Sequence, residues 1–259
     1  MQFIGENGIL GIEICRWEFS ERMIGIIGAM QVEVEDLLSH MQNPCKQTHV
    51  GTTFYSGQIS GVDCVVAQSG VGKVAAAVCA AAMIECYHPQ AVLCEGVAGG
   101  IGKDVHIGDL VVATKLVQYD MDTTPLGDPL GYLSDLKTVY LEAPAGLRET
   151  IVSCAREFYS GHVFEGIIAT GDQFVADNQK FHEIAGKFGA SACEMEGGAI
   201  AQACCMAGVE FAVLRTISDN GDDDASVDFP TFAADAAHKN TALLRTLLPQ
   251  LAGRMEMAL

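Results

Sequence analysis

Short apolar runs alternate with helical patterns along the chain from residue 23 onward. The runs are continuously apolar, which is typical of strands that are buried on both faces of a sheet. Apolar residues recur at helical spacing between them, and Pro89 follows one such stretch as a stop signal. The expected strands are 23–29, 62–68, 91–97, 109–117, 166–171, 190–195 and 211–218. The expected helices are 32–41, 73–87, 146–159, 178–188, 197–208 and 231–253.

This alternation predicts an α/β fold in which helices cover both faces of one sheet. No internal repeat, low-complexity linker or change of composition divides the pattern, so we expect a single domain over residues 23–259. Residues 1–22 do not follow the pattern, and they lack the basic start and the small-residue cleavage site of a secretion signal. We interpret residues 1–22 as an N-terminal extension of doubtful standing.

The chain is strongly acidic, with 15 Lys and Arg against 33 Asp and Glu and a formal charge of −18. Because nucleic acids and anionic membranes are bound by clustered cations, we expect neither as a partner. No apolar run approaches the ~18 residues of a membrane span.

The ten cysteines form no CxxC pair and no zinc-finger spacing. They indicate free thiols in the reducing cytoplasm rather than disulfides or a metal site.

Ligands of such sheets bind beyond the carboxyl ends of the strands. Glu33 follows the first expected strand and falls in the first turn of the next helix, where the helix dipole stabilises a carboxylate. An ordinary first-turn glutamate is the alternative interpretation. Glu194 and Glu196 flank Met195, and strand alternation would place both on one face. Such a pair suits the vicinal hydroxyls of ribose, with capping of the following helix as the alternative.

Asp219 ends the last expected strand, and an acidic run, 222–224, follows it. Burial and nearby like charges raise the pKa of a carboxyl group, as a general acid requires near neutral pH. The alternative is a solvated acidic loop with Asp219 capping a turn. Phe174 and Phe229 are candidate surfaces for stacking a flat ring, although an isolated phenylalanine of this kind is more often part of the core.

Two glycine-rich turns, 69–73 and 96–100, also follow expected strands. Neither matches the GxGxxG or GxxxxGK[ST] pattern, so the signal for a nucleotide-phosphate loop is weak. Small residues in these turns still allow the backbone to approach a ligand closely.

The segments IIGAM-x-x-E, SGVGKV, VAGG, TGDQF, EMEGGAIA and RTISD occur in this order within residues 23–259. In this combination the chain resembles the methylthioadenosine/S-adenosylhomocysteine nucleosidases of the purine nucleoside phosphorylase superfamily. The resemblance implies a three-layer αβα fold with a central mixed sheet, a homodimer, and no metal or cofactor. It also implies hydrolysis of the N-glycosidic bond of 5′-methylthioadenosine and S-adenosylhomocysteine, which releases adenine and a 5-thioribose. Related nucleosides such as 5′-deoxyadenosine are further candidate substrates.

The resemblance also implies roles for single residues. Glu33 would deprotonate the attacking water, Asp219 would protonate N7 of adenine, and Ser218 would position Asp219. Glu196 would bind the ribose hydroxyls. The other expected substrate contacts are Met30, Val71, Val97, Phe174, Val175, Met195 and Phe229.

The chain departs from the family pattern at two places. Val97 stands where the family usually carries Ser, which removes a polar contact near the substrate. The segment 119–126 matches the loop that reaches the neighbouring subunit in the family. The usual aromatics of that loop are replaced by Leu126 and Asp128. These changes leave the preference among 5′-substituents open.

Two other functions remain as alternatives. A phosphate-dependent purine nucleoside phosphorylase would need cations around the phosphate. The first loop supplies no Arg, Glu33 would repel phosphate, and Arg215 alone beside an acidic segment is not a convincing site. A non-catalytic nucleoside-binding protein would not need both Glu33 and Asp219.

Overall fold

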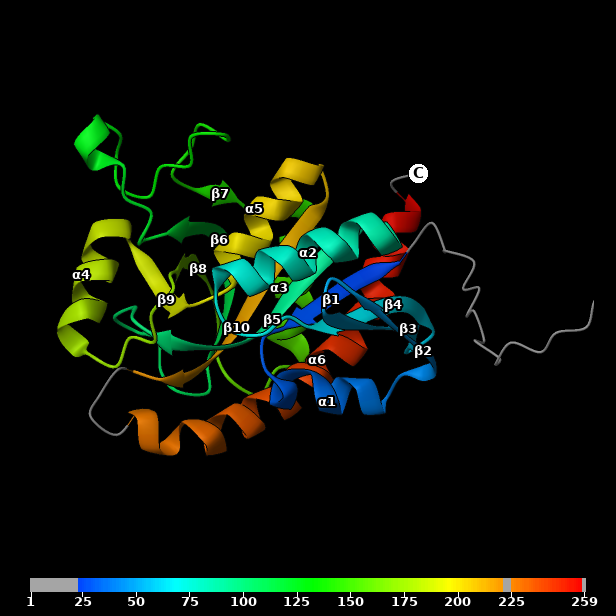
Figure 1. Cartoon of the computed structure of the whole chain (residues 1–259). Helices are drawn as coiled ribbons and strands as arrows, with labels where there is room; N and C mark the ends of the chain where they lie inside the picture. The colour runs from blue at the N-terminus through cyan, green and yellow to red at the C-terminus, as the bar shows by residue number, and fades with distance from the viewer. Residues whose placement is uncertain (1–22, 221–224, 258–259) are drawn as a thin grey trace, which may run out of the picture.

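A computed structural model describes residues 23–220 and 225–257, without the side chains of residues 225–231 and 256–257 (Figure 1). The strands are β1 (Ile24–Gly28), β2 (Gln42–His49), β3 (Thr52–Ile59), β4 (Val62–Gln68), β5 (Ala91–Gly100), β6 (Leu110–Gln118), β7 (Leu141–Glu142), β8 (Val163–Thr170), β9 (Ala190–Glu194) and β10 (Glu210–Asp219). The helices are α1 (Gln31–Ser39), α2 (Lys73–Tyr87), the 3₁₀ turn η1 (Thr124–Leu126), α3 (Ala145–Phe158), α4 (Asn178–Phe188), α5 (Gly197–Ala207) and α6 (Ala225–Met257).

Every expected strand and helix is present, with ends shifted by a few residues. β5 and β10 continue beyond their predicted ends to Gly100 and Asp219, and β9 ends one residue early at Glu194. The hairpin of β2 and β3 was not predicted. β2 lies at the edge of the sheet and is mostly exposed, so its sequence QNPCKQTH carries no apolar pattern.

The sheet is mixed, and one part of it closes on itself. The strand order is β10-β6-β8-β9-β5-β1-β4-β3-β2, and β10 also pairs with β5. Gly99 of β5 therefore lies beside Asp219 of parallel β10 and opposite Cys193 of antiparallel β9. A Cβ atom on Gly99 would lie 3.2 Å from Asp219 Oδ1 and would collide with the Phe181 ring. Glycine at this position thus lets three strands and helix α4 meet.

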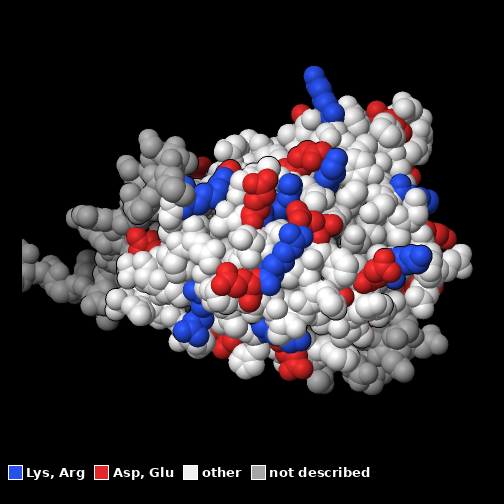
Figure 2. Space-filling view, turned by 180° about the vertical axis from the view of Figure 1, so that it is seen from behind, with Lys and Arg blue, Asp and Glu red and all other residues white. Residues whose placement is uncertain are grey.

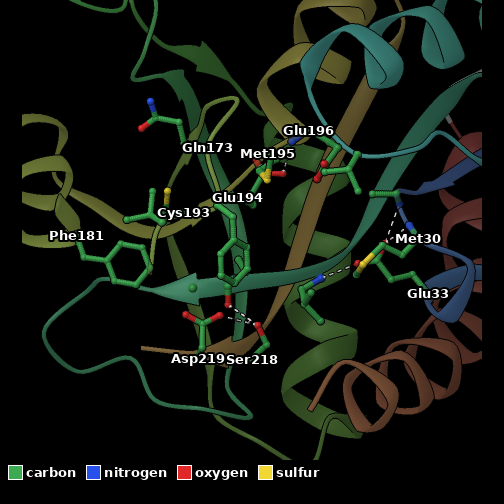
Figure 3. A pocket seen from close by; sticks show the side chains of 17 residues that line it. Met30, Glu33, Gln173, Phe181, Cys193, Glu194, Met195, Glu196, Ser218 and Asp219 are labelled. Carbon is green, nitrogen blue, oxygen red and sulfur yellow. Dashed lines mark hydrogen bonds between the residues drawn. The ribbon is translucent and has the colours of Figure 1, made fainter. Parts of the chain in front are cut away.

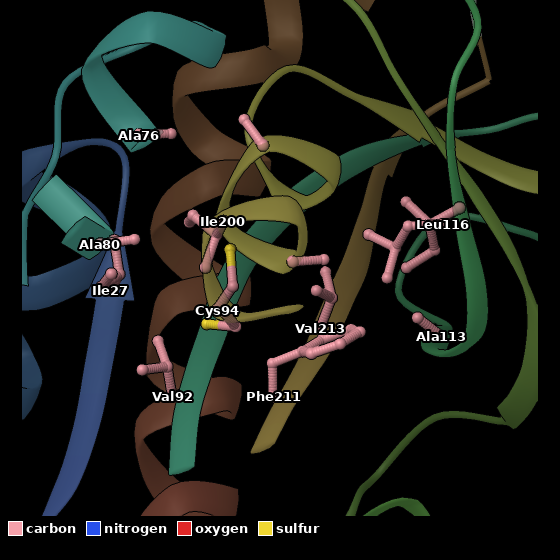
Figure 4. Packing of buried hydrophobic residues seen from close by; sticks show 14 of the residues in the cluster. Ile27, Ala76, Ala80, Val92, Cys94, Ala113, Leu116, Ile200, Phe211 and Val213 are labelled. Atoms are coloured by element: carbon pink, nitrogen blue, oxygen red, sulfur yellow. The ribbon is translucent and has the colours of Figure 1, made fainter. Parts of the chain in front are cut away.

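Helices cover both faces of the sheet, which confirms the predicted three-layer αβα fold. α2 and α5 pack together on one face, and α1 and α3 pack with α6 on the other (Figure 1). Adjacent residues of β1 face opposite layers. Ile27 belongs to the cluster with Ala80 of α2, which Figure 4 shows, whereas Ile26 belongs to the cluster with Leu37 of α1 and Leu247 of α6. Both faces of β1 are buried, as its continuous apolar sequence predicts.

On the face seen in Figure 2, acidic and basic side chains are interspersed and neither sign forms a continuous patch. In the part of the chain that the structure describes, no helix is long and apolar enough to cross a membrane.

Candidate active site

One cavity of about 340 Å³ opens where β5, β9 and β10 meet, beside the loop that follows β1. Residues far apart in the sequence line it, and Figure 3 shows their side chains. Its predicted members are Met30, Glu33, Val71, Val97, Phe174, Val175, Met195, Glu196, Ser218 and Asp219. The side chain of Phe229, the remaining predicted contact, lies outside the described residues.

Glu33 is buried in the first turn of α1 and is held by backbone N–H groups. Its Oε2 accepts hydrogen bonds from the N–H of Ala29 at 2.7 Å and of Met30 at 2.8 Å. Its Oε1 accepts one from the N–H of Val97 on β5 at 3.1 Å. Burial raises the pKa of Glu33, although the positive charge of Arg215 and these three N–H groups act in the opposite direction. The result is a fixed carboxylate with an increased affinity for a proton.

The approach of Glu33 to β5 requires a glycine. A Cβ atom on Gly96 would collide with Oε1 of Glu33 and would lie 3.1 Å from Nη1 of Arg215. The glycine-rich turn 96–100 therefore admits a carboxylate of this chain against its backbone.

Glu194 and Glu196 come together for a different reason from the one predicted. β9 ends at Glu194, so strand alternation does not reach Glu196, which is the N-cap residue of α5. Instead, the N–H groups of Glu196 and Gly197 donate to Oε2 of Glu194 at 3.0 and 2.7 Å. Arg215 donates to the same oxygen through Nη2 at 2.5 Å and Nε at 3.2 Å. The helix-capping interpretation thus applies to Glu194, whose Oε1 also accepts a hydrogen bond from Thr170.

Glu196 accepts fewer hydrogen bonds than Glu194. Its Oε1 accepts a hydrogen bond from the N–H of Gly72 at 2.9 Å, and its Oε2 lies 3.8 Å from Nη2 of Arg215. Burial, and then the negative charge of Glu194, raise the pKa of Glu196 to about 7. Figure 3 shows Glu196 beside Met195 at the cavity wall, where its carboxylate can meet a ligand hydroxyl.

Asp219 and Ser218 end β10 on another side of the cavity from Glu33 (Figure 3). Both are buried, and Ser218 Oγ donates a hydrogen bond to Asp219 Oδ2 at 3.0 Å. Ser218 Oγ also lies 3.4 Å from the carbonyl oxygen of Ala98. The acidic run 222–224 lies outside the described residues.

The rest of the cavity wall is mostly apolar. Val71 and Phe174 are 57% and 52% exposed at its rim, whereas Val175 is buried. Phe181 and Cys193 also line the cavity and were not predicted to do so, and the same is true of Ala29 and Gln173. Glu194, from the predicted carboxylate pair, and Ala98 and Gly99, from the predicted glycine-rich turn, complete the lining.

The charged side chains in the described lining of the cavity are all acidic. The described lining residues include the carboxyl groups of Glu33, Glu194, Glu196 and Asp219, and they include no Lys or Arg. Arg215 lies behind this wall, fully buried and paired with Glu194. Among the residues that the structure describes, no three His, Cys, Asp or Glu side chains are grouped so as to hold a metal ion.

Comparison with known proteins points to one family. The sequence profile of the phosphorylase superfamily matches residues 23–249. A 5′-methylthioadenosine/S-adenosylhomocysteine nucleosidase from Shewanella sp. (strain MR-7) is 38% identical over 229 residues, which cover 88% of this chain and 97% of the relative.

Solved structures give the same result. The nucleosidase of the same name from Neisseria meningitidis, in complex with methylthio-immucillin-A, superimposes with a TM-score of 0.85 at 32% identity, covering 88% of this chain and 99% of that one. A futalosine hydrolase mutant from Helicobacter pylori strain 26695 gives a TM-score of 0.84 at 34% identity, with the same coverage of both chains.

Proposed function

Because the chain belongs to the phosphorylase superfamily and, within it, to the 5′-methylthioadenosine/S-adenosylhomocysteine nucleosidases, we propose that it hydrolyses the N-glycosidic bond of these two nucleosides. The products are adenine and a 5-thioribose. One observation carries the proposal: the carboxyl groups of Glu33 and Asp219 face one cavity from different sides, and Glu196 lies at its wall. Cleavage of a glycosidic bond through an oxocarbenium-like state needs a base on one side of the sugar and an acid at the leaving group.

Glu33 acts as the base in this proposal. Its carboxylate orients a water molecule toward the anomeric carbon of the ribose and accepts a proton as the new C–O bond forms. The hydrogen bonds from Ala29, Met30 and Val97 support this role, because they keep the carboxylate fixed while the reaction proceeds. Burial supports it further by raising the proton affinity of the group.

Asp219 acts as the acid. It donates a proton to N7 of adenine as the C–N bond breaks, so that the electron pair of that bond leaves with a neutral base. Ser218 orients Asp219 through the hydrogen bond at 3.0 Å. Each turnover thus moves one proton from water to Glu33 and one from Asp219 to adenine, and both groups return to their starting states through solvent.

The remaining contacts bind the substrate. Glu196 accepts hydrogen bonds from the 2′ and 3′ hydroxyls of the ribose, and Met195 packs beneath the sugar. Phe174 stacks on adenine, whose edge meets the backbone of Val175. Met30, Val71, Val97 and Phe229 complete the sugar and 5′ side of the proposed site.

Hydrolysis is favoured over phosphorolysis by the charges at the site. A phosphorylase must hold a phosphate anion, and such sites use Arg or similar donors. The described lining of the cavity is acidic, and Arg215 already donates two hydrogen bonds to Glu194. Water is therefore the nucleophile that this wall accommodates.

Two further proposals complete the account. We propose that the enzyme is a homodimer that associates through α2 and α5, because Val74 and Met206 on these helices are 75% and 64% exposed and border a groove between them. Replacement of both residues by Glu is expected to yield monomers in analytical ultracentrifugation. Val50→Glu, at an equally exposed valine in the β2–β3 turn, is the control that stays dimeric.

We also propose that the enzyme is located in the cytoplasm, since its described cysteines are free thiols.

The activity is tested by following free adenine with 5′-methylthioadenosine, S-adenosylhomocysteine and 5′-deoxyadenosine, each with and without phosphate. We expect adenine release that does not depend on phosphate. Formation of a ribose 1-phosphate product only when phosphate is present would instead identify a phosphorylase. Binding of these nucleosides without turnover would identify a non-catalytic binding protein.

A further inference from the structure

A fifth acidic residue, Glu95, lies behind the cavity without lining it. It occupies the middle of β5 and is 2% exposed. A buried carboxylate is stable only when a cation or several donors compensate its charge. The neighbouring cation, Arg215, donates its hydrogen bonds to Glu194 instead. Glu95 therefore differs from Glu194 and Glu196, with which Arg215 forms ion pairs.

One oxygen of Glu95 belongs to an ordered chain of hydrogen bonds. Oε2 accepts from Nδ2 of Asn240 on α6 at 3.0 Å. Thr216 donates to Oδ1 of Asn240 at 2.7 Å and is itself 2.9 Å from the hydroxyl of Tyr159. With the oxygen of the amide accepting from Thr216, the nitrogen of Asn240 points toward Glu95. The orientation of Glu95 is thus determined from behind the site.

The other oxygen, Oε1, is buried and has no hydrogen-bond partner among the described residues. Its position is given by Gly28, which ends β1. A Cβ atom on Gly28 would lie 3.3 Å from Oε1 of Glu95 and 3.1 Å from Cβ of Glu33. Oε1 therefore faces the turn that carries Glu33, and a proton on Glu95 would lie on this side.

The charges around Glu95 favour its neutral form. Glu33 faces it from α1 and Arg215 from β10, and Arg215 also interacts with Glu194 and Glu196. The described part of α6 contributes the neutral amide of Asn240, and the sequence of β1 contains no titratable residue. Burial, and then repulsion by Glu33, raise the pKa of Glu95 to about 8.

We propose that Glu95 is a positioning residue for the hydrolysis, a buried carboxylic acid that keeps its own proton and so leaves Glu33 as the ionised member of the pair. This inference rests on the proposed function, in which Glu33 must be ionised to accept a proton from water. Three backbone donors favour the charge on Glu33, whereas Glu95 receives one amide donor. Loss of the proton from Glu95 would place two anions side by side, and their repulsion would raise the pKa of Glu33 and so change its strength as a base.

Infrared spectroscopy of the unliganded protein between pH 5 and 10 tests the inference without any substrate. We expect a carbonyl band of a protonated carboxylic acid that persists above pH 7 and disappears near pH 8. Glu196, whose pKa is raised to about 7, contributes to the same band at lower pH. Glu95→Gln should abolish the component that titrates near pH 8, whereas Glu142→Gln, at an exposed carboxylate on β7, should retain it. Absence of that component from the native protein, or its persistence in Glu95→Gln, would overturn the inference.

The pH dependence of kcat/KM gives the second readout. The rate of Glu95→Gln relative to the native enzyme should change severalfold between pH 7 and 9, because only the native enzyme acquires the second anion. A purely structural role would leave this ratio constant and would contradict the inference.

Asn240→Ala provides an independent variant, which also decides the question if Glu95→Gln does not fold. Loss of the amide donor should move the disappearance of the infrared band to higher pH, since that donor stabilises the ionised form. An unchanged titration would argue against the proposed environment of Glu95. If the native enzyme released no adenine, the proposed function would fail, while the infrared titration would still report on Glu95.

Discussion

The two carboxyl groups of the proposed mechanism, Glu33 and Asp219, are held in different ways. Glu33 lies in the first turn of a helix and accepts hydrogen bonds from three backbone N–H groups of two elements. Asp219 ends a strand and accepts a hydrogen bond from the adjacent hydroxyl of Ser218. A backbone N–H can only donate, whereas a hydroxyl can donate or accept. The surroundings of Glu33 therefore favour an anion, whereas the Ser218 hydroxyl can serve either protonation state of Asp219, as an acid that gains and loses a proton requires.

The largest effect is expected on turnover. Glu33→Gln cannot accept the proton of water, and Asp219→Asn cannot protonate adenine. Each variant should lower kcat by roughly 10²–10⁴-fold, as is typical for loss of an acid or base. Steady-state adenine release from 5′-methylthioadenosine measures this. A variant that hydrolyses the substrate at nearly the native rate would refute the role given to its residue.

Stability should separate the two variants. An amide at position 33 must present its NH2 group to at least one of the three N–H donors, and this conflict should cost about 1–3 kcal/mol in the free energy of unfolding. The Ser218 hydroxyl can rotate to suit an amide at position 219, so this contact should cost less in Asp219→Asn than the three N–H contacts cost in Glu33→Gln. Urea unfolding followed by circular dichroism tests this difference, and equal destabilisation of both variants would contradict it.

Ser218→Ala should have a smaller effect on catalysis. It removes the hydrogen bond that orients Asp219, and we expect kcat to fall by about tenfold with little change in KM, which corresponds to ~1.4 kcal/mol and lies within the range for one neutral hydrogen bond. Ser153→Ala, at an exposed serine of α3, is the matched control. A native kcat in Ser218→Ala would show that Asp219 does not depend on this contact.

The smallest expected effect is a displacement of the acid limb of the pH profile of kcat/KM. Glu33 is inactive as a base when protonated, and burial raises its pKa from the ordinary value of 4.5. Activity should therefore fall, as the pH is lowered, through a midpoint above 4.5. A profile that stays flat down to pH 4.5 would be inconsistent with a buried base at Glu33.

The contrast between the two carboxylates also explains what the sequence could reveal. The strands of the core were predictable because burial on both faces leaves a continuous apolar run. Glu33 was predictable because its contacts with Ala29 and Met30 depend on local helix geometry alone. Features set within a few residues of each other leave a signal that a single sequence carries.

Other features depend on contacts between distant segments. The sequence indicates only that Phe181 is an apolar residue of α4. Its side chain lines the cavity because β5, β9 and β10 come together beside it. Glu196 was predicted from the family resemblance and from strand alternation, and β9 does not continue that alternation. Glu95 contacts Asn240 across 145 residues, and no local pattern indicates that contact.

The most direct test of the two roles uses a 5-methylthioriboside whose leaving group, such as 4-nitrophenolate, departs without protonation. Release of nitrophenolate by the native enzyme, Asp219→Asn and Glu33→Gln is compared under the same conditions. Asp219→Asn should recover most of the native rate, because the acid is no longer needed, while Glu33→Gln should remain impaired by at least about 10²-fold. Equal impairment of both variants on this substrate would contradict the assignment of Glu33 as the base and Asp219 as the acid.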